Sequence, residues 1–251
     1  IRDDLVTGVQ TCALPILLRL APHRVRPLNF MIPVYQRNLS FWMMKLGVGL
    51  YTFWMRRLRS TPISSCETKK VCGLKQENLK GFLTYEDAAT DDTLMVLELI
   101  HGAVELGACA LNYVQARGAL VEGTRVSSVE VQDLIEGDIF HIKAQSFIGS
   151  MGPWVKDNGL KWHGDVCFSK GVHLVLPHKV GDEALLLWAP QDDRVFFVLP
   201  WYGKTLVGTT DTYYEGDVNH IDVTEEDVEY LLTAFQHYFP DLNAQKNDIL
   251  A

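Results

Sequence analysis

Apolar residues return along the chain at two different spacings, and each spacing predicts a different kind of element. Over residues 91–108 they recur every three or four positions, which is typical of a helix with one apolar face. A second helix is predicted over residues 224–239, where Thr224 and Asp227 approximate a capping box and Pro240 follows the last turn.

After residue 109 the period shortens towards two, which predicts β-strands. Predicted strands cover residues 110–113, 119–121, 126–131, 139–144 and, ending in a glycine-rich turn, 147–154. A later run of strands covers residues 171–176, 184–189, 194–199 and 205–208. Because the links between successive strands are short, we expect mainly antiparallel pairing.

A further helix is predicted over residues 39–55, a mostly apolar run with five aromatic residues. It carries an internal charge, Lys45, and is shorter than the roughly 20 apolar residues that a membrane-spanning helix needs. One interpretation is a buried or half-buried helix. The other is a helix lying at a membrane surface, with Trp42 and Trp54 towards lipid and the arginines that follow near the headgroups.

The first 16 residues stand apart from the rest. Residues 8–16 resemble the translation of a sequencing adapter, so we expect residues 1–16 to be an artefactual leader. A signal peptide is the alternative, but Asp3 and Asp4 stand where a basic region belongs. We divide the remainder into a helical cap segment of a substrate domain (17–90), part of a nucleotide-binding domain (91–164), and an antiparallel substrate-domain sheet with a helix (165–251).

Composition narrows the class of protein. The 251 residues are 47% hydrophobic and 22% charged, which suits one large or two small domains with a real core. The net charge of −8 argues against a general nucleic-acid binder, which needs a basic surface to neutralise phosphates. Five cysteines without a CxxC pair indicate reduced thiols and a cytoplasmic location. The histidines show no metal-ligand spacing, so we predict no metal site.

Several segments together resemble the FAD-dependent glycerol-3-phosphate dehydrogenases, over about residues 20–251. The most informative are 170–177, with His173 inside an apolar strand, 194–201, which ends in Pro-Trp, and the Gly-Thr-Thr-Asp turn at 208–211. The others, in the family's order, are 21–33, 91–98, 152–156 and 224–232. The resemblance implies a mixed α/β fold, in which a partial FAD-binding domain is interleaved with an antiparallel substrate-binding sheet, as in the two-domain D-amino-acid oxidases.

The resemblance also implies a role for His173, which stands in the family's Gly-x-His-x-x-x-Pro pattern. Oxidising a secondary alcohol by hydride transfer requires a base for the hydroxyl proton, and a neutral imidazole with a pKa of about 6.5 can accept it. FAD accepts the hydride. We therefore expect His173 to be the base, or to orient the hydroxyl, in the oxidation of glycerol 3-phosphate to dihydroxyacetone phosphate. A quinone or another acceptor would then take the electrons.

Cofactor contacts are implied for the turn at residues 149–154, because it resembles a family turn that passes close to the flavin. Glycine there lets the backbone approach a ligand without a Cβ. The implied contacts come from Gly149, Gly152, Pro153 and Trp154. Serine and methionine stand where the family usually has Ala-Thr, so the threonine hydroxyl is missing. Val126 corresponds to a valine whose backbone meets the adenine side of the flavin in related folds. An ordinary turn and an ordinary strand valine are the alternatives.

Three residues of the later turn, Thr209, Thr210 and Asp211, are expected to line the substrate cleft or to anchor the turn. Lys204 could attract a phosphate, although lone lysines on loops are usually solvated. Arg194 is interpreted as the start of a strand.

One expected motif is missing. A flavin enzyme of this kind needs a G-x-G-x-x-G turn after a strand, which seats the pyrophosphate at a helix N-terminus. The sequence has none, so we interpret the chain as an internal fragment with little or no activity alone. It also lacks the G-x-S-x-G elbow of serine hydrolases. Two alternatives stay open: a related FAD-dependent amine or amino-acid oxidase, and a non-catalytic fragment that acts as a binding module.

Overall fold

The computed structural model describes residues 18, 21–35, 39–56, 71–156 and 166–251. The predicted leader lies outside these residues. The chain divides into two compact units, each built from separated segments. The first unit comprises Ile1–Val96, Gly171–Thr212 and Val223–Ala251, and the second comprises Leu97–Lys170 and Tyr213–Asp222. The domain boundaries drawn from the sequence stay predictions.

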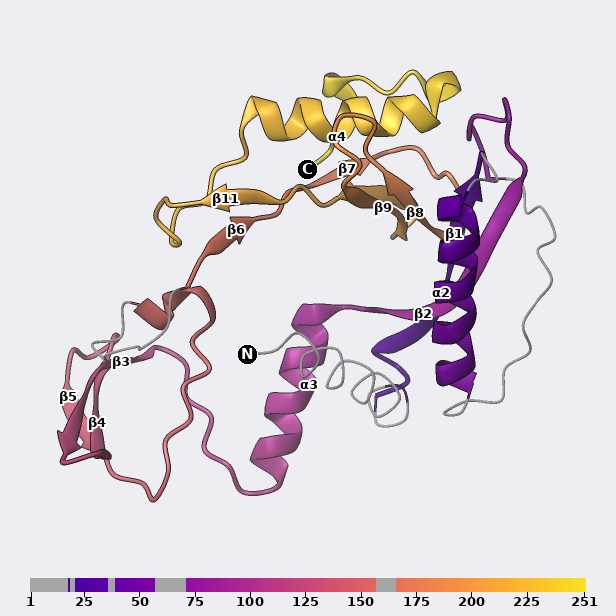
Figure 1. Cartoon of the computed structure of the whole chain (residues 1–251). Helices are drawn as coiled ribbons and strands as arrows, with labels where there is room; N and C mark the ends of the chain where they lie inside the picture. The colour runs from indigo at the N-terminus through magenta and orange to yellow at the C-terminus, as the bar shows by residue number, and fades with distance from the viewer. Residues whose placement is uncertain (1–17, 19–20, 36–38, 57–70, 157–165) are drawn as a thin grey trace. The chain divides into compact units, whose positions relative to one another are not determined.

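A six-stranded sheet forms the centre of the first unit, with the strand order β2-β1-β8-β9-β10-β7 (Figure 1). The strands are β1 (Val25–Val34), β2 (Gly81–Thr90), β7 (His173–Leu176), β8 (Ala184–Trp188), β9 (Val195–Trp201) and β10 (Lys204–Gly208). Neighbouring strands pair antiparallel, except for a short parallel contact between β1 and β8. The four strands predicted after residue 170 and their antiparallel pairing are confirmed.

Helix α4 (Glu225–Tyr238) runs alongside this sheet (Figure 1). Its buried apolar side chains belong to the core of the sheet. Thr224 caps the helix: its hydroxyl accepts from the Asp227 N–H, and the Asp227 carboxylate accepts from the Thr224 N–H at 3.0 Å. Leu231 and Phe235 are fully buried in the core, and burying a side chain of this size stabilises a fold by about 1.5–3 kcal/mol. The predicted helix and its capping box are confirmed. Two short 3₁₀ helices, η2 (Pro240–Leu242) and η3 (Lys246–Asp248), follow.

The second unit contains two smaller sheets. Strands β3 (Val114–Glu122), β4 (Arg125–Asp133) and β5 (Ile139–Ile142) form an antiparallel meander, and β6 (Phe168–Lys170) pairs with β11 (Thr212–Tyr214). The 3₁₀ helix η1 (Gly152–Lys156) lies between them in sequence. The strands predicted at 119–121, 126–131 and 139–144 are therefore confirmed, with shifted ends.

Helix α3 (Asp92–Glu105) begins in the first unit and continues into the second. Its first turn is capped by the Asp91 carboxylate, which accepts from the Leu94 N–H at 3.0 Å. No side chain of α3 is buried by the described part of the chain.

Three predictions about elements are wrong. Residues 110–113 are not a strand. The segment predicted at 147–154 is not a strand either, since residues 147–151 join no ladder and residues 152–156 form η1. Segment 17–90, expected to be helical, contributes the long strands β1 and β2. Pro27 and Pro33 obscure β1 in the sequence, since proline cannot donate to a ladder. The strand tolerates both because its second neighbour, β8, pairs only with Phe30 and Met31.

Helix α2 (Leu39–Arg56) is confirmed as a helix. It was predicted to be buried or half-buried, or to lie at a membrane surface, and none of the side chains described at residues 42–50 is fully buried. Only Met44 and Val48, one turn apart, are partly covered between residues 42 and 50. Trp42, Met43 and Leu46 are more than half exposed, at 58%, 66% and 66%. Among the described residues, no helix is long and apolar enough to cross a membrane.

Candidate functional site

Strands β7 and β10 bring the two most informative sequence segments side by side. Their antiparallel register places His173 opposite Gly208, the last residue of β10. A Cβ built on Gly208 would lie 2.4 Å from Cδ2 of the His173 ring and 3.0 Å from the Val172 carbonyl oxygen. Because both distances are shorter than ordinary contacts, only glycine fits at this position. The imidazole therefore lies against the bare backbone of Gly208.

The same two segments also come close to each other at Gly171 and Thr209, near this pair in the sequence. A Cβ built on Gly171 would lie 2.5 Å from the Thr209 hydroxyl oxygen. The Thr210 hydroxyl accepts from the Val172 N–H at 2.9 Å, and the Thr210 N–H donates to the Val172 carbonyl at 3.2 Å. These two bonds extend the contact between the strands beyond the end of β10 and hold the following loop against β7.

The loop residues predicted to line a substrate cleft differ in exposure. Thr210 is only 3% exposed and its hydroxyl is used inside the fold. Thr209 is partly exposed, with its hydroxyl donating to the Thr210 carbonyl at 2.9 Å, and Asp211 is exposed. A cleft role stays a prediction for all three residues, and the structure leaves Thr209 and Asp211 more accessible than Thr210.

The His173 ring is accessible to solvent, yet protein atoms cover part of it. This partial burial lowers the pKa of His173 below its ordinary value of 6.5, because loss of water disfavours the charged imidazolium. The ring is therefore neutral at pH 7. A neutral imidazole that still meets solvent is the form that a general base requires.

Arg194 connects three elements around the loop at residues 208–211. Its Nε donates to the Asp192 carboxylate at 2.6 Å, and Nη1 donates to the carbonyl oxygen of Asp211. The guanidinium also lies 5.0 Å from the ring centroid of Tyr230, a residue of α4. The Tyr230 hydroxyl donates to the Asp192 carboxylate at 3.0 Å. Arg194, interpreted from the sequence as the start of a strand, directly precedes β9. Its role as an anchor of the loop was missed, because no local pattern relates it to residue 211.

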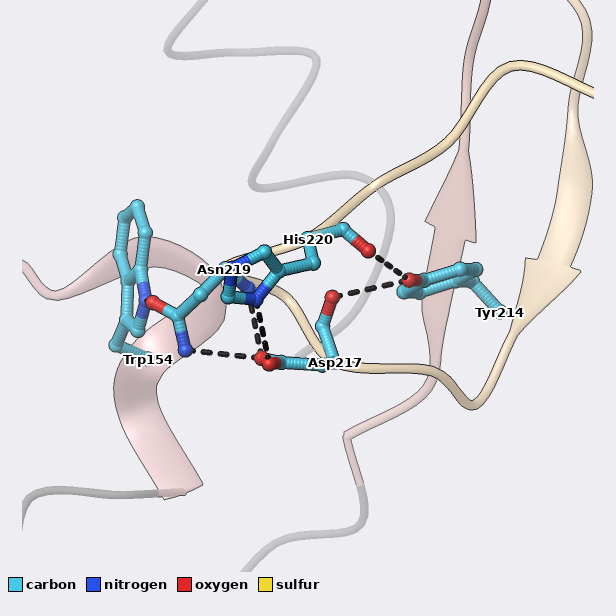
Figure 2. Close-up of polar contacts among 5 residues, drawn as sticks. All are labelled: Trp154, Tyr214, Asp217, Asn219 and His220. Carbon is cyan, nitrogen blue, oxygen red and sulfur yellow. Dashed lines mark hydrogen bonds and ion pairs between the residues drawn. The ribbon is translucent and has the colours of Figure 1, made fainter.

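The turn at residues 149–154 belongs to the second unit. Gly152 has a φ of 51°, which favours glycine, and nothing lies within 4 Å of a Cβ built on it. The backbone there is open to an approaching group. Trp154, two residues later on η1, is 48% exposed, and its indole N–H donates to Oδ1 of Asn219 at 2.8 Å (Figure 2). Gly149 and Pro153, which belong to the same turn, are also exposed.

Val126 lies near the start of β4, paired with Val121 across the β3–β4 hairpin. The hairpin turn includes Gly123 at a φ of 64°. Val126 is thus in the second unit, together with the 149–154 turn, whereas His173 and residues 209–211 are in the first.

The described part of the chain contains a surface hollow but no candidate metal site. No group of three His, Cys, Asp or Glu side chains there could hold a metal ion. A surface hollow of about 460 Å³ lies in the first unit, lined by Tyr35, Lys75, Glu77, Asn78, His237 and Tyr238. It includes none of the residues predicted from the sequence, so it is separate from the candidate site.

The sequence and the fold match those of a family of known proteins. The family model described as DAO, FAD dependent oxidoreductase, matches residues 15–250. Because this match covers nearly the whole chain, the protein belongs to the DAO family of FAD-dependent oxidoreductases. The fold class predicted from the sequence is confirmed.

More specific similarities point to one branch of that family. The chain is 33% identical to Alpha-glycerophosphate oxidase of Streptococcus pneumoniae serotype 4, over 93% of this chain and 41% of that protein. It is 30% identical to Aerobic glycerol-3-phosphate dehydrogenase of Staphylococcus haemolyticus, over 93% of this chain and 44% of that protein. The structure of glycerol-3-phosphate dehydrogenase from Bacillus halodurans complexed with FAD has a TM-score of 0.75 and 29% identity, covering 95% of this chain and 45% of that one. The chain thus spans less than half the length of each of these three proteins.

Proposed function

We propose that this chain is the part of an FAD-dependent enzyme that binds and deprotonates sn-glycerol 3-phosphate during its oxidation to dihydroxyacetone phosphate. The observation that carries this proposal is the neutral, accessible imidazole of His173 against Gly208, in a chain similar over 93% of its length to proteins named for this substrate.

The described residues fit a flavin enzyme at two places. Gly152 offers open backbone where the ring system of FAD would approach, and His173 offers a base for an alcohol. Gly149, Pro153 and Trp154 would contact FAD beside Gly152, with Val126 on its adenine side. When bound, FAD supplies the acceptor for the hydride that leaves the substrate carbon.

The chain's own residues would handle the proton. The substrate hydroxyl would donate its proton to a ring nitrogen of His173 as its carbon gives up the hydride, so that a carbonyl forms. The lowered pKa of His173 keeps the ring neutral before this step. Thr209 and Asp211 would line the substrate side, on a loop held by the Arg194 contacts and by Thr210.

Substrate oxidation with a dye acceptor tests this function in a full-length protein that carries the segment. We expect turnover with glycerol 3-phosphate and none with glycine or D-amino acids. Turnover with amino acids instead would support the amine or amino-acid oxidase alternative. A protein without flavin absorbance and without turnover would be the binding module that forms the second alternative.

The electron acceptor is proposed to be a quinone. The relatives are named both as dehydrogenases and as oxidases, so molecular oxygen is the competing acceptor. Oxygen consumption and quinone reduction, measured side by side with glycerol 3-phosphate, distinguish them. Hydrogen peroxide formed at the rate of substrate loss would contradict the quinone proposal.

Contact with a membrane surface is proposed for α2, because Trp42, Met43 and Leu46 are exposed and Lys45 lies beside Trp42 at 5.2 Å from its ring. Exchange of both Trp42 and Leu46 for serine should weaken co-sedimentation with anionic vesicles about tenfold, since two large apolar side chains no longer enter the interface. Leu111→Ser, at a 62% exposed position outside α2, is the matched control. Equal sedimentation of all three proteins would refute the contact.

A further inference from the structure

The loop that follows β11 is organised around the Asp217 carboxylate (Figure 2). Its Oδ1 accepts from the Asn219 backbone N–H at 2.8 Å and from the Asn219 side-chain amide at 2.9 Å. Its Oδ2 lies 2.9 Å from Nδ1 of His220. The bond from the Asn219 backbone, then that from His220, lowers the pKa of Asp217 to about 2. The carboxylate is therefore ionised, and acts only as an acceptor, at every pH where the protein is expected to work.

Tyr214 ties the ends of the same loop together. Its hydroxyl lies 2.9 Å from the carbonyl oxygen of Asp217 and 3.0 Å from that of His220, and its single proton is shared between them (Figure 2). The backbone on both sides of Asn219 is thereby held.

This arrangement leaves the Asn219 amide only one orientation that satisfies its neighbours. Asp217 can only accept, so the amide nitrogen must face it. The amide oxygen then points the other way, towards the indole N–H of Trp154, which can only donate. A flipped amide would place donor against donor and acceptor against acceptor.

The contact between Asn219 and Trp154 joins segments 65 residues apart in the sequence. Trp154 is 48% exposed, so packing alone does not determine where its indole lies. Trp154 sits on η1 directly after Gly152 and Pro153, in the turn whose backbone is open to a ligand.

We infer that Asn219, oriented by Asp217, is a positioning residue that holds the Gly152–Trp154 turn in the conformation that receives the flavin. The inference rests on the proposed function in one respect, namely that this turn contacts FAD. The bond itself belongs to this chain and can be examined without the cofactor.

The first test observes the indole directly. The chain has six tryptophans, so a ¹⁵N-indole NMR spectrum of the full chain is simple, and Trp154→Phe identifies the Trp154 signal. Asn219→Ala and the isosteric Asn219→Leu should shift that signal and speed its exchange with water about three- to tenfold, because neither side chain offers an acceptor to the indole N–H. Asn112→Ala, at an exposed loop position of the same unit, is the control and should change nothing. An unchanged Trp154 signal in Asn219→Ala would overturn the inference.

The second test measures FAD affinity in the full-length protein by quenching of flavin fluorescence. Asn219→Ala and Asn219→Leu should bind FAD about three- to tenfold more weakly, as expected for one lost hydrogen bond. A shifted indole signal with unchanged FAD affinity would overturn the positioning role while leaving the proposed function intact. A wild-type protein that binds no FAD would instead overturn the proposed function, and the positioning role with it.

Discussion

Replacing His173 with glutamine is expected to lower kcat for glycerol 3-phosphate oxidation by about 10²–10⁴-fold in a full-length protein that carries this segment, the usual contribution of a general base. Glutamine is close to histidine in size and keeps a polar group against Gly208, but it cannot accept the proton. Flavin content and the free energy of unfolding should change little, because the ring is accessible and lies at the edge of the core.

The pH dependence gives this prediction a second readout. The wild-type rate should fall as pH decreases through a pKa below 6.5, since the protonated ring cannot accept a proton. His173→Gln should lack this limb. The free energy of unfolding should depend on pH in the same direction. In the unfolded chain His173 takes up a proton near pH 6.5, whereas in the folded chain it does so only at lower pH. The folded state therefore loses stability as pH falls through this window. The glutamine variant should lose that dependence as well.

His141→Gln is the matched control, because His141 is also an exposed histidine within a strand, β5. It should retain wild-type turnover and the wild-type pH profile. If His173→Gln retains turnover within a factor of about three of wild type, a base contribution of the usual size is absent, and His173 is not the proton acceptor.

Gly208→Ala should also lower turnover, although residue 208 carries no reactive group. The added methyl would lie 2.4 Å from the His173 ring and 3.0 Å from the Val172 carbonyl, so the ring must move and the two strands must separate slightly. Overpacking of this kind costs about 1–3 kcal/mol of unfolding free energy. We expect turnover to fall about 10–100-fold, because a displacement of about 1 Å at a reacting group costs this much. Thermal unfolding and steady-state kinetics measure the two effects.

A double-mutant cycle isolates the contact with the ring. In a His173→Ala background the clash with the ring is gone, so Gly208→Ala should cost less stability there than in the wild type. Gly118→Ala is the control, since Gly118 also lies in a strand and nothing approaches within 4 Å of a Cβ built on it. An equal stability cost for Gly208→Ala in both backgrounds would show that the ring does not occupy the position described.

Much of the fold could be predicted where the determinants are local. The cap of α4, its apolar spacing and the proline after it lie within 17 residues, 224–240, and the helix forms there. The four strands predicted after residue 170 are short apolar runs with turn residues between them, and all four are present. Strand β1 was missed because its two prolines lack the N–H that a strand ladder uses, so they argue locally against a strand. The structure accommodates them because β8 pairs with β1 only at Phe30 and Met31.

The candidate site was predicted only in part. His173 could be proposed from a family pattern within a single strand, but the need for glycine at 208 could not. Thr210 was predicted to line the substrate cleft or to anchor the turn, and its hydroxyl accepts a hydrogen bond from the Val172 N–H. Arg194 and Asn219 carry no local indication of the loop or the turn that each one contacts.

The sequence by itself determined the family, the helix α4, the strands that carry the site and the histidine with the appropriate chemistry. Only the tertiary structure decided that Gly208 lies opposite His173, that Arg194 holds Asp211, and that Asn219 holds Trp154. The reason is physical. Apolar spacing and capping act within a few residues, whereas strand register and long-range hydrogen bonds depend on which distant segments become neighbours when the core forms.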